Sequence, residues 1–131
     1  GETPLGAAVD RTILPFSDWR SADPYGGPQP GPADIACILY TSGTTGPSKG
    51  VLLPHAHCYL YGLGMVESCR MTPDDRLYDV LPLYHVNGLF IQVYGCLVAG
   101  ATAIIRERFS ASAWLDDVIE QRATLTVVVG A

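Results

Sequence analysis

The stretch LYTSGTTGPSKGV, residues 39–51, decides how the rest of this 131-residue chain is interpreted. It follows an apolar run that begins at Ile35, and it consists mainly of serine, threonine and glycine. Lys49, the only lysine of the chain, lies near its end. Glycines let the backbone turn its N–H groups toward an anion, while hydroxyl and ammonium groups donate to phosphate oxygens. The stretch therefore predicts a phosphate-binding loop directly after a β-strand.

Two common phosphate-binding motifs do not fit this loop. The P-loop pattern needs glycine before its lysine and serine or threonine after it, whereas Ser48 precedes Lys49 and Gly50 follows it. The dinucleotide fingerprint G-x-G-x-x-G fails as well, because the third glycine is absent after Gly62 and Gly64. Two alternatives stay open, a turn without a ligand and a stand-alone phosphate- or nucleotide-binding module without catalysis.

The composition is that of a folded globular protein. Apolar residues make up 48% of the chain and charged residues 16%. The net charge of −5 and the lack of a basic run argue against nucleic acid as a partner. Four cysteines without a C-x-x-C pair predict reduced thiols and a cytoplasmic protein. Residues 80–105 carry no charge, but their proline, glycines and polar side chains argue against a membrane-spanning helix.

The chain divides into an irregular part and a regular part. Residues 1–33 hold six of the ten prolines and five of the fourteen glycines, which predicts an irregular lead-in. Residues 34–131 form a partial α/β domain in which apolar runs alternate with helical patterns. The expected strands are residues 35–40, 77–83, 101–106 and 123–129, and the expected helices are residues 55–69, 88–99 and 110–122.

This alternation predicts the fold class. Strands that alternate with helices form a mostly parallel sheet with flanking helices, here a partial doubly wound α/β sheet. The run at residues 35–40 is continuously apolar, so it is expected to be buried on both faces. Ligands bind beyond the carboxyl ends of such strands, where the predicted phosphate loop stands. The last strand is followed by no polar linker, so we expect these residues to belong to a larger domain.

The motif YTSGTTGPSKG resembles the phosphate-binding signature of the AMP-forming adenylate-forming enzymes. That superfamily includes acyl- and aryl-CoA ligases, luciferases and nonribosomal peptide adenylation domains. The stretches KGVLLPHAH, LPLYHVNGL and LVAGATAII resemble the motifs that follow the signature in the acid–CoA ligase branch. The resemblance implies an enzyme that joins a small carboxylic acid to the α-phosphate of ATP, releases pyrophosphate and transfers the acyl group to coenzyme A.

The same resemblance implies roles for individual residues. The nucleotide-binding set is Thr41, Ser42, Gly43, Thr44, Thr45, Gly46 and Lys49. Thr44 or Thr45 is expected near Mg²⁺. His85 is expected to be catalytic, beside the carboxylate and the α-phosphate, and to line the substrate pocket with Asn87 and Gly88. The residues by themselves also fit a hydrogen-bonded core histidine at position 85 and a helix start at Asn87.

An amino-acid-activating adenylation domain is the main alternative within the superfamily. Such domains carry an aspartate in the motif where His85 stands, so His85 favours an acid without an amino group. The later motifs of the superfamily do not lie within these residues, so we expect the chain by itself not to catalyse adenylation. We also expect it to self-associate through exposed strand edges. His55 and His57 have no third ligand nearby and are interpreted as a helix start.

Overall fold

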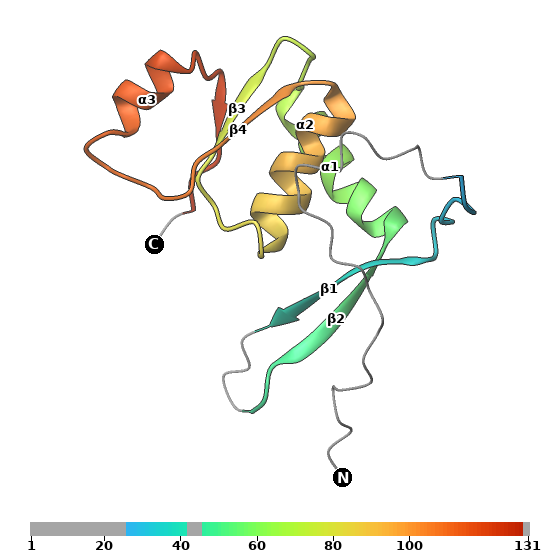
Figure 1. The fold of residues 1–131 in the computed structure, drawn as a ribbon. Helices are drawn as coiled ribbons and strands as arrows, with labels where there is room; N and C mark the ends of the chain where they lie inside the picture. The colour runs from blue at the N-terminus through green and yellow to red at the C-terminus, as the bar shows by residue number, and fades with distance from the viewer. Residues whose placement is uncertain (1–25, 42–45, 130–131) are drawn as a thin grey trace.

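The computed structural model describes residues 26–41 and 46–129, and Figure 1 shows their arrangement. In chain order the elements are β1 (Ile35–Thr41), β2 (Lys49–Pro54), α1 (His55–Cys69), β3 (Arg76–Asp79), the π-helix η2 (Asn87–Val93), α2 (Tyr94–Ala99), β4 (Thr102–Ile105), α3 (Trp114–Glu120) and β5 (Leu125–Thr126). β3 is the central strand of a parallel sheet with the order β4-β3-β5, whereas β1 and β2 form a separate antiparallel pair. The predicted α/β class is confirmed.

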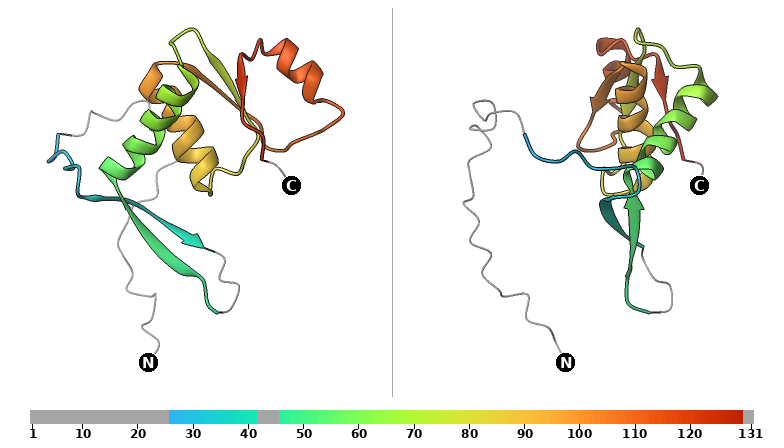
Figure 2. Two further views of the ribbon diagram at one scale, coloured as in Figure 1. Left: turned by 180° about the vertical axis from the view of Figure 1, so that it is seen from behind. Right: turned by 90° about the vertical axis from the view of Figure 1, so that its right-hand side faces the viewer.

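Helices cover both faces of the parallel sheet. Successive residues of a strand face opposite sides of the sheet, so the contacts of Leu77 and Tyr78 of β3 show what covers each face. Leu77 is fully buried and belongs to one core cluster with Met65 of α1 and Cys96 of α2. Tyr78 faces the other side, where its hydroxyl group donates to the Asp117 carboxylate of α3 over 2.9 Å. The sheet therefore lies between α3 and the α1–α2 pair, as Figure 2 shows, which confirms the doubly wound arrangement.

The first strand does not have the place that the sequence predicts. Residues 35–40 are expected to be buried on both faces of the parallel sheet. Instead β1 pairs with β2 in an antiparallel hairpin that projects from the body of the molecule, and Tyr40 is 73% exposed. The expected place is wrong because an apolar run favours extended backbone without specifying its partner strand. The predicted phosphate loop thus joins two strands of a hairpin, not a strand and a helix.

Most other elements occur where they are expected, and α1 has the predicted bounds. β3 ends at Asp79 rather than continuing to residue 83, because the chain turns away from the sheet before Pro82. β5 and α3 are likewise shorter than predicted. The helix expected at residues 88–99 is divided into η2 and α2.

A residue with left-handed backbone conformation follows each α-helix. Gly100, with a φ of 71°, follows α2, which ends at Ala99 as predicted, while Arg70 (φ 53°) ends α1 and Arg122 (φ 49°) follows α3. In each case the next N–H donates to a carbonyl oxygen five residues earlier, as from Met71 to Val66. This pattern is the Schellman motif, in which glycine is the usual left-handed residue.

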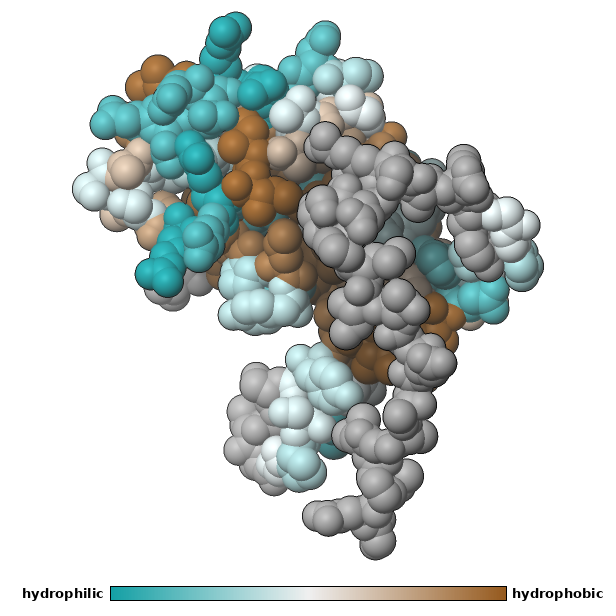
Figure 3. Space-filling model, in the orientation of Figure 1, coloured by the Kyte–Doolittle hydropathy of each residue, from teal (hydrophilic) through white to brown (hydrophobic). Residues whose placement is uncertain are grey.

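Apolar side chains are also exposed outside the core. The apolar side chains of α3 are only partly covered, because Leu115 and Ile119 are 58% and 65% exposed. Figure 3 shows brown, apolar atoms in the middle of the face that it draws. None of the helices in the described part of the chain has the length and apolar character needed to cross a bilayer.

Candidate functional site

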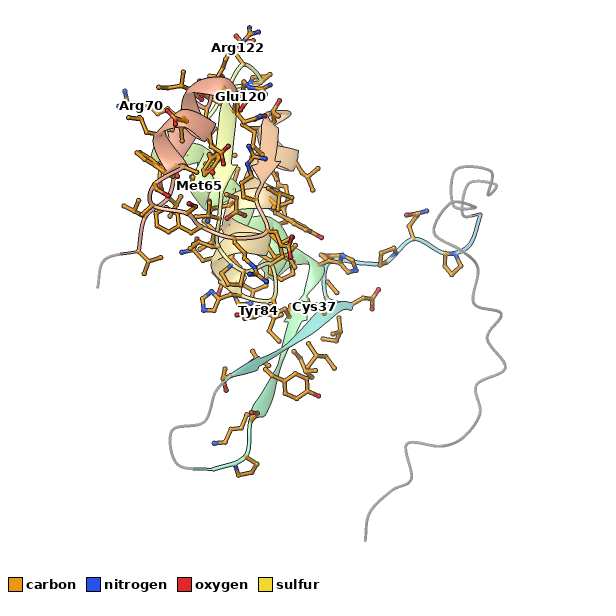
Figure 4. All side chains as sticks on the ribbon, turned by 60° about the vertical axis from the view of Figure 1, so that its left-hand side comes forward. Cys37, Met65, Arg70, Tyr84, Glu120 and Arg122 are labelled. Atoms are coloured by element: carbon orange, nitrogen blue, oxygen red, sulfur yellow. The ribbon has the colours of Figure 1, made fainter. Side chains whose placement is uncertain are left out.

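A pocket of about 590 Å³ opens where the β1–β2 hairpin meets α1 and the turn that follows β3. Its lining residues are Leu39, Tyr40 and Thr41 of β1, Val51 and Leu53 of β2, His57 and Tyr61 of α1, and Tyr84, His85 and Val86 of the turn. Figure 4 shows Tyr84 at this junction. A mainly apolar and aromatic lining with a few polar groups is typical of a small-molecule site.

The hairpin holds the two ends of the predicted phosphate loop together. Thr41 and Lys49 are partners in the ladder, and the Thr41 hydroxyl group donates to the Lys49 carbonyl oxygen over 3.4 Å. Both residues are exposed, and Thr41 also lines the pocket. Gly46 is exposed as well. The predicted ligands Ser42, Gly43, Thr44 and Thr45 lie outside the described residues, so their roles stay predictions.

His85 lies in the turn, where hydrogen bonds hold both its backbone and one nitrogen of its ring. Its N–H donates to the Pro82 carbonyl oxygen over 3.0 Å, and its own carbonyl oxygen accepts from the Leu89 N–H over 3.1 Å. Its Nδ1 accepts from the Asn87 N–H over 3.2 Å. A neutral imidazole whose Nδ1 accepts carries its proton on Nε2, which can then donate to a ligand oxygen. Because His85 is exposed and lines the pocket, it is not a core histidine.

Asn87 and Gly88, which the sequence places in the substrate pocket, are not among the residues that line this pocket. Asn87 begins η2, as the helix-start interpretation expects, and its Oδ1 accepts from the buried Gln92 Nε2 over 3.3 Å. Gly88 is buried, and a Cβ at this position would lie 2.7 Å from the Pro82 carbonyl oxygen. Glycine is therefore required where η2 packs against the turn.

Sequence reasoning missed four aromatic residues of the pocket, the first of which is Tyr40 of β1. His57 and Tyr61 lie four residues apart on α1, and their rings stack with centroids 4.7 Å apart. Their i,i+4 spacing on the helix was the available signal. Tyr84 was missed although it directly precedes His85. α1 begins at His55, which confirms the helix-start interpretation, and the described ranges hold no metal-ligand group of three or more His, Cys, Asp or Glu side chains.

A buried carboxyl group lies at the start of the turn. Asp79, the last residue of β3, is 0% exposed, and its Oδ1 accepts from the Leu81 N–H over 2.8 Å. Its Oδ2 has no hydrogen-bond partner in the described part of the chain. Burial raises the pKa of the Asp79 carboxyl group, and the hydrogen bond from Leu81 opposes this effect.

The chain is similar to AMP-binding enzymes along nearly its whole length. The model of the AMP-binding enzyme family matches residues 5–131. The indoleacetate–CoA ligase of Aromatoleum aromaticum is 41% identical over 104 residues, which cover 79% of the chain and 20% of that relative. The sulfoacetate–CoA ligase of Cupriavidus necator is 40% identical over 127 residues, which cover 95% of the chain and 25% of that relative. The chain therefore spans a fifth to a quarter of the length of these two ligases.

Solved structures of similar sequence share this fold. ATP-bound MatB from Rhodopseudomonas palustris superposes with a TM-score of 0.66 at 43% identity, over 73% of the chain and 19% of that structure. O-succinylbenzoate coenzyme A synthetase (MenE) from Bacillus subtilis, in complex with ATP and a magnesium ion, superposes with a TM-score of 0.68 at 30% identity. That match covers 74% of the chain and 20% of the MenE chain.

Proposed function

The chain belongs to the AMP-binding enzyme family, and from this membership we propose that the complete protein carrying it is an AMP-forming acid–CoA ligase. The protein joins a carboxylic acid to the α-phosphate of ATP, releases pyrophosphate and transfers the acyl group to coenzyme A. One observation carries the proposal: the pocket that contains His85 also contains Thr41, at one end of the predicted phosphate loop. The similarity to two acid–CoA ligases supports the same reaction.

The phosphate loop deals with the main electrostatic difficulty of this reaction. A carboxylate must approach a polyphosphate, so like charges have to be positioned and neutralised. The chain as a whole carries a charge of −5 and does not attract a nucleotide, so local donors have to supply the attraction. We propose that Thr41, Gly46 and Lys49, with residues 42–45 between them, hold the β- and γ-phosphates. Lys49 supplies a compact positive charge there.

Magnesium fits the same loop by the chemistry of its donors. Mg²⁺ prefers oxygen ligands and is commonly held by a few protein oxygens together with substrate phosphates. Thr44 or Thr45 is the proposed protein ligand. When it is bound, Mg²⁺ offsets the negative charge of the phosphates.

His85 is the proposed contact to the reacting groups. Its Nε2 carries the proton of the neutral ring, because the Asn87 N–H occupies Nδ1. A donor at this position can bind a carboxylate oxygen or an α-phosphate oxygen and align the two for attack. Asn87 and Gly88 support this position from behind, and a role of either in the substrate pocket stays a prediction. The four free cysteines support the proposal of a cytoplasmic location.

The test is carboxylate-dependent exchange of pyrophosphate into ATP, measured with the complete protein. The panel contains fatty, aryl and small acids, including indoleacetate and sulfoacetate, together with amino acids. Exchange with acids that lack an amino group, followed by thioester formation with coenzyme A, is the expected result. Exchange only with amino acids would instead identify an amino-acid-activating domain. Nucleotide binding without exchange for any acid would identify a binding module.

A further inference from the structure

We propose that Asp79 is a positioning residue for His85: its buried carboxyl group fixes the turn that presents the imidazole to the pocket. The inference rests on the proposed role of His85 and adds a residue that does not itself line the pocket. It is carried by a continuous chain of contacts from the end of β3 to Nδ1 of the ring.

The first contacts fix Asp79 itself. Its backbone is held in the parallel sheet, where it pairs with Ile105 of β4 and its carbonyl oxygen accepts from the Arg106 N–H over 2.9 Å. Its side chain is fully buried. From this fixed point Oδ1 accepts the Leu81 N–H over 2.8 Å. A carboxylate that binds the N–H two residues later forms an Asx turn, which directs the chain away from the strand.

The next contacts carry this constraint to His85. The Pro82 carbonyl oxygen accepts the His85 N–H. The Leu81 and Pro82 carbonyl groups pack so closely on Gly88 that a Cβ there would lie 2.9 and 2.7 Å from their oxygens. The turn is thus held between Asp79 on one side and η2 on the other. Loss of the Asp79 contact releases Leu81 and, through it, the histidine.

The unpaired oxygen argues against a role in stability alone. Burying a polar atom without a hydrogen bond destabilises the folded state, and the Asp79 Oδ2 is such an atom. An apolar side chain of similar volume would avoid that cost but would leave the Leu81 N–H without its acceptor. Asp79 thus costs stability while it holds the turn that carries His85. Such a cost is expected at functional positions, where a residue is kept for orientation rather than for stability. Asparagine is a suitable comparison, because its amide keeps an acceptor oxygen for the Leu81 N–H.

The first experiment compares variants of the complete protein in the exchange assay. Asp79→Leu keeps the branched shape of the side chain, adds some bulk and removes the acceptor, whereas Asp79→Asn keeps Oδ1. We expect Asp79→Leu to lower kcat by about tenfold with the KM for ATP within about twofold, and Asp79→Asn to restore kcat to within about threefold. The matched control is Asp75→Leu, directly before β3, where the wild-type carboxylate accepts the Thr72 N–H over 2.8 Å. We expect this control to leave kcat unchanged. Equal losses of kcat in the Asp75 and Asp79 variants would overturn the inference.

A double-mutant cycle tests whether Asp79 acts through His85. If it does, Asp79→Leu should change kcat by less than about twofold once His85→Ala is present. Additive losses would mean that Asp79 acts independently of the histidine, and the inference would be wrong. If His85→Ala alone leaves exchange unchanged, the proposed function of His85 fails instead.

A spectroscopic measurement keeps the inference testable without activity. Nitrogen-15 NMR of labelled histidine distinguishes the two neutral tautomers, and the His85 signal is the one that His85→Ala removes. We expect the Nε2–H form in the wild type and in Asp79→Asn, and a mixture in Asp79→Leu. An unchanged tautomer in Asp79→Leu would contradict the proposal. Asp79→Ala, which removes the same acceptor without adding bulk, replaces Asp79→Leu if that variant does not fold.

Discussion

Asp75, directly before the short strand β3, and Asp79, its last residue, have carboxyl pKa values that are shifted in opposite directions. The N–H of Thr72 and the hydroxyl group of Thr124 donate to Asp75 and lower its carboxyl pKa. Burial raises the pKa of the Asp79 carboxyl group. The two carboxyl groups therefore make contributions of opposite sign to the dependence of stability on pH.

The sign of each contribution gives a prediction. The contribution of Asp75 is present above its ordinary pKa and is lost as the pH falls through the lowered folded pKa. The contribution of Asp79 is present below its ordinary pKa and is lost as the pH rises through the raised folded pKa. Asp75→Asn should therefore destabilise the protein at neutral pH, and less so in acid. Asp79→Asn should gain stability over the wild type as the pH rises. Chemical denaturation across pH measures both, and parallel profiles for the two variants would contradict the assignment.

Lys49 gives a prediction that separates binding from stability. Its side chain is exposed at the end of the hairpin, so its truncation should not disturb the core. A hydrogen bond from a charged group contributes about 1.5–3 kcal/mol. Lys49→Ala should therefore raise the KM for ATP by about tenfold or more in the complete protein, with little change in the thermal midpoint. Lys49→Arg is the control that keeps the charge. A large fall in the thermal midpoint would show that Lys49 is structural.

The sequence pointed to some of these residues and not to others. Thr41, Lys49 and His85 stand in recognisable motifs, and the structure brings Thr41 and His85 to one pocket. Asp79 was not found, because a single aspartate in an apolar run shows neither its burial nor the N–H that it accepts. His57 was interpreted only as a helix start, since its place in the pocket depends on how α1 meets the hairpin.

At the scale of elements, the contact between α1 and α2 depends on a glycine. Gly62 of α1 is buried, and a Cβ there would lie 2.9 Å from the Tyr94 carbonyl carbon at the start of α2. Gly64, two residues later on the same helix, is exposed and has nothing within 4 Å of that position. The two glycines form a matched pair, because only one lies between packed helices.

Substitution by alanine should therefore have opposite effects at these positions. Gly64→Ala should stabilise the protein by about 0.5–1 kcal/mol, because alanine loses less entropy in a helix. Gly62→Ala should destabilise it, because crowding a packed contact costs about 1–3 kcal/mol and exceeds that gain. Urea denaturation of the complete protein measures both values. Stabilisation by both substitutions would mean that α1 and α2 are not packed so closely.

Elements with a clear periodicity could be predicted, and those that depend on a partner could not. α1 has the predicted bounds, and α2 ends at Ala99 as predicted. β2 was missed, because residues 49–54 form a strand only through pairing with β1. The π-helix η2 has no sequence pattern of its own, and the close packing of Gly88 on the turn before it could not be predicted either.

At the scale of the whole molecule, the exposed apolar surface gives a prediction about association. Leu97, Ile119 and Val128 are 69%, 65% and 81% exposed, and they lie on or near α2, α3 and β5. Exposed apolar side chains favour contacts between molecules. The 131-residue chain prepared by itself should therefore form oligomers whose mass rises with concentration in light scattering. Ile119→Lys should reduce this mass, and a monomer at every concentration would contradict the prediction.

Two arginines occupy backbone positions that suit glycine better. Arg70 and Arg122 have a positive φ, and left-handed backbone costs a residue with a side chain about 1–2 kcal/mol. Figure 4 shows both arginines at the end of the molecule opposite the hairpin. Their strain is thus unrelated to the pocket, and relieving it would leave the reacting groups untouched. Replacing either arginine with glycine should raise the free energy of unfolding, which would help storage, crystallisation and long assays.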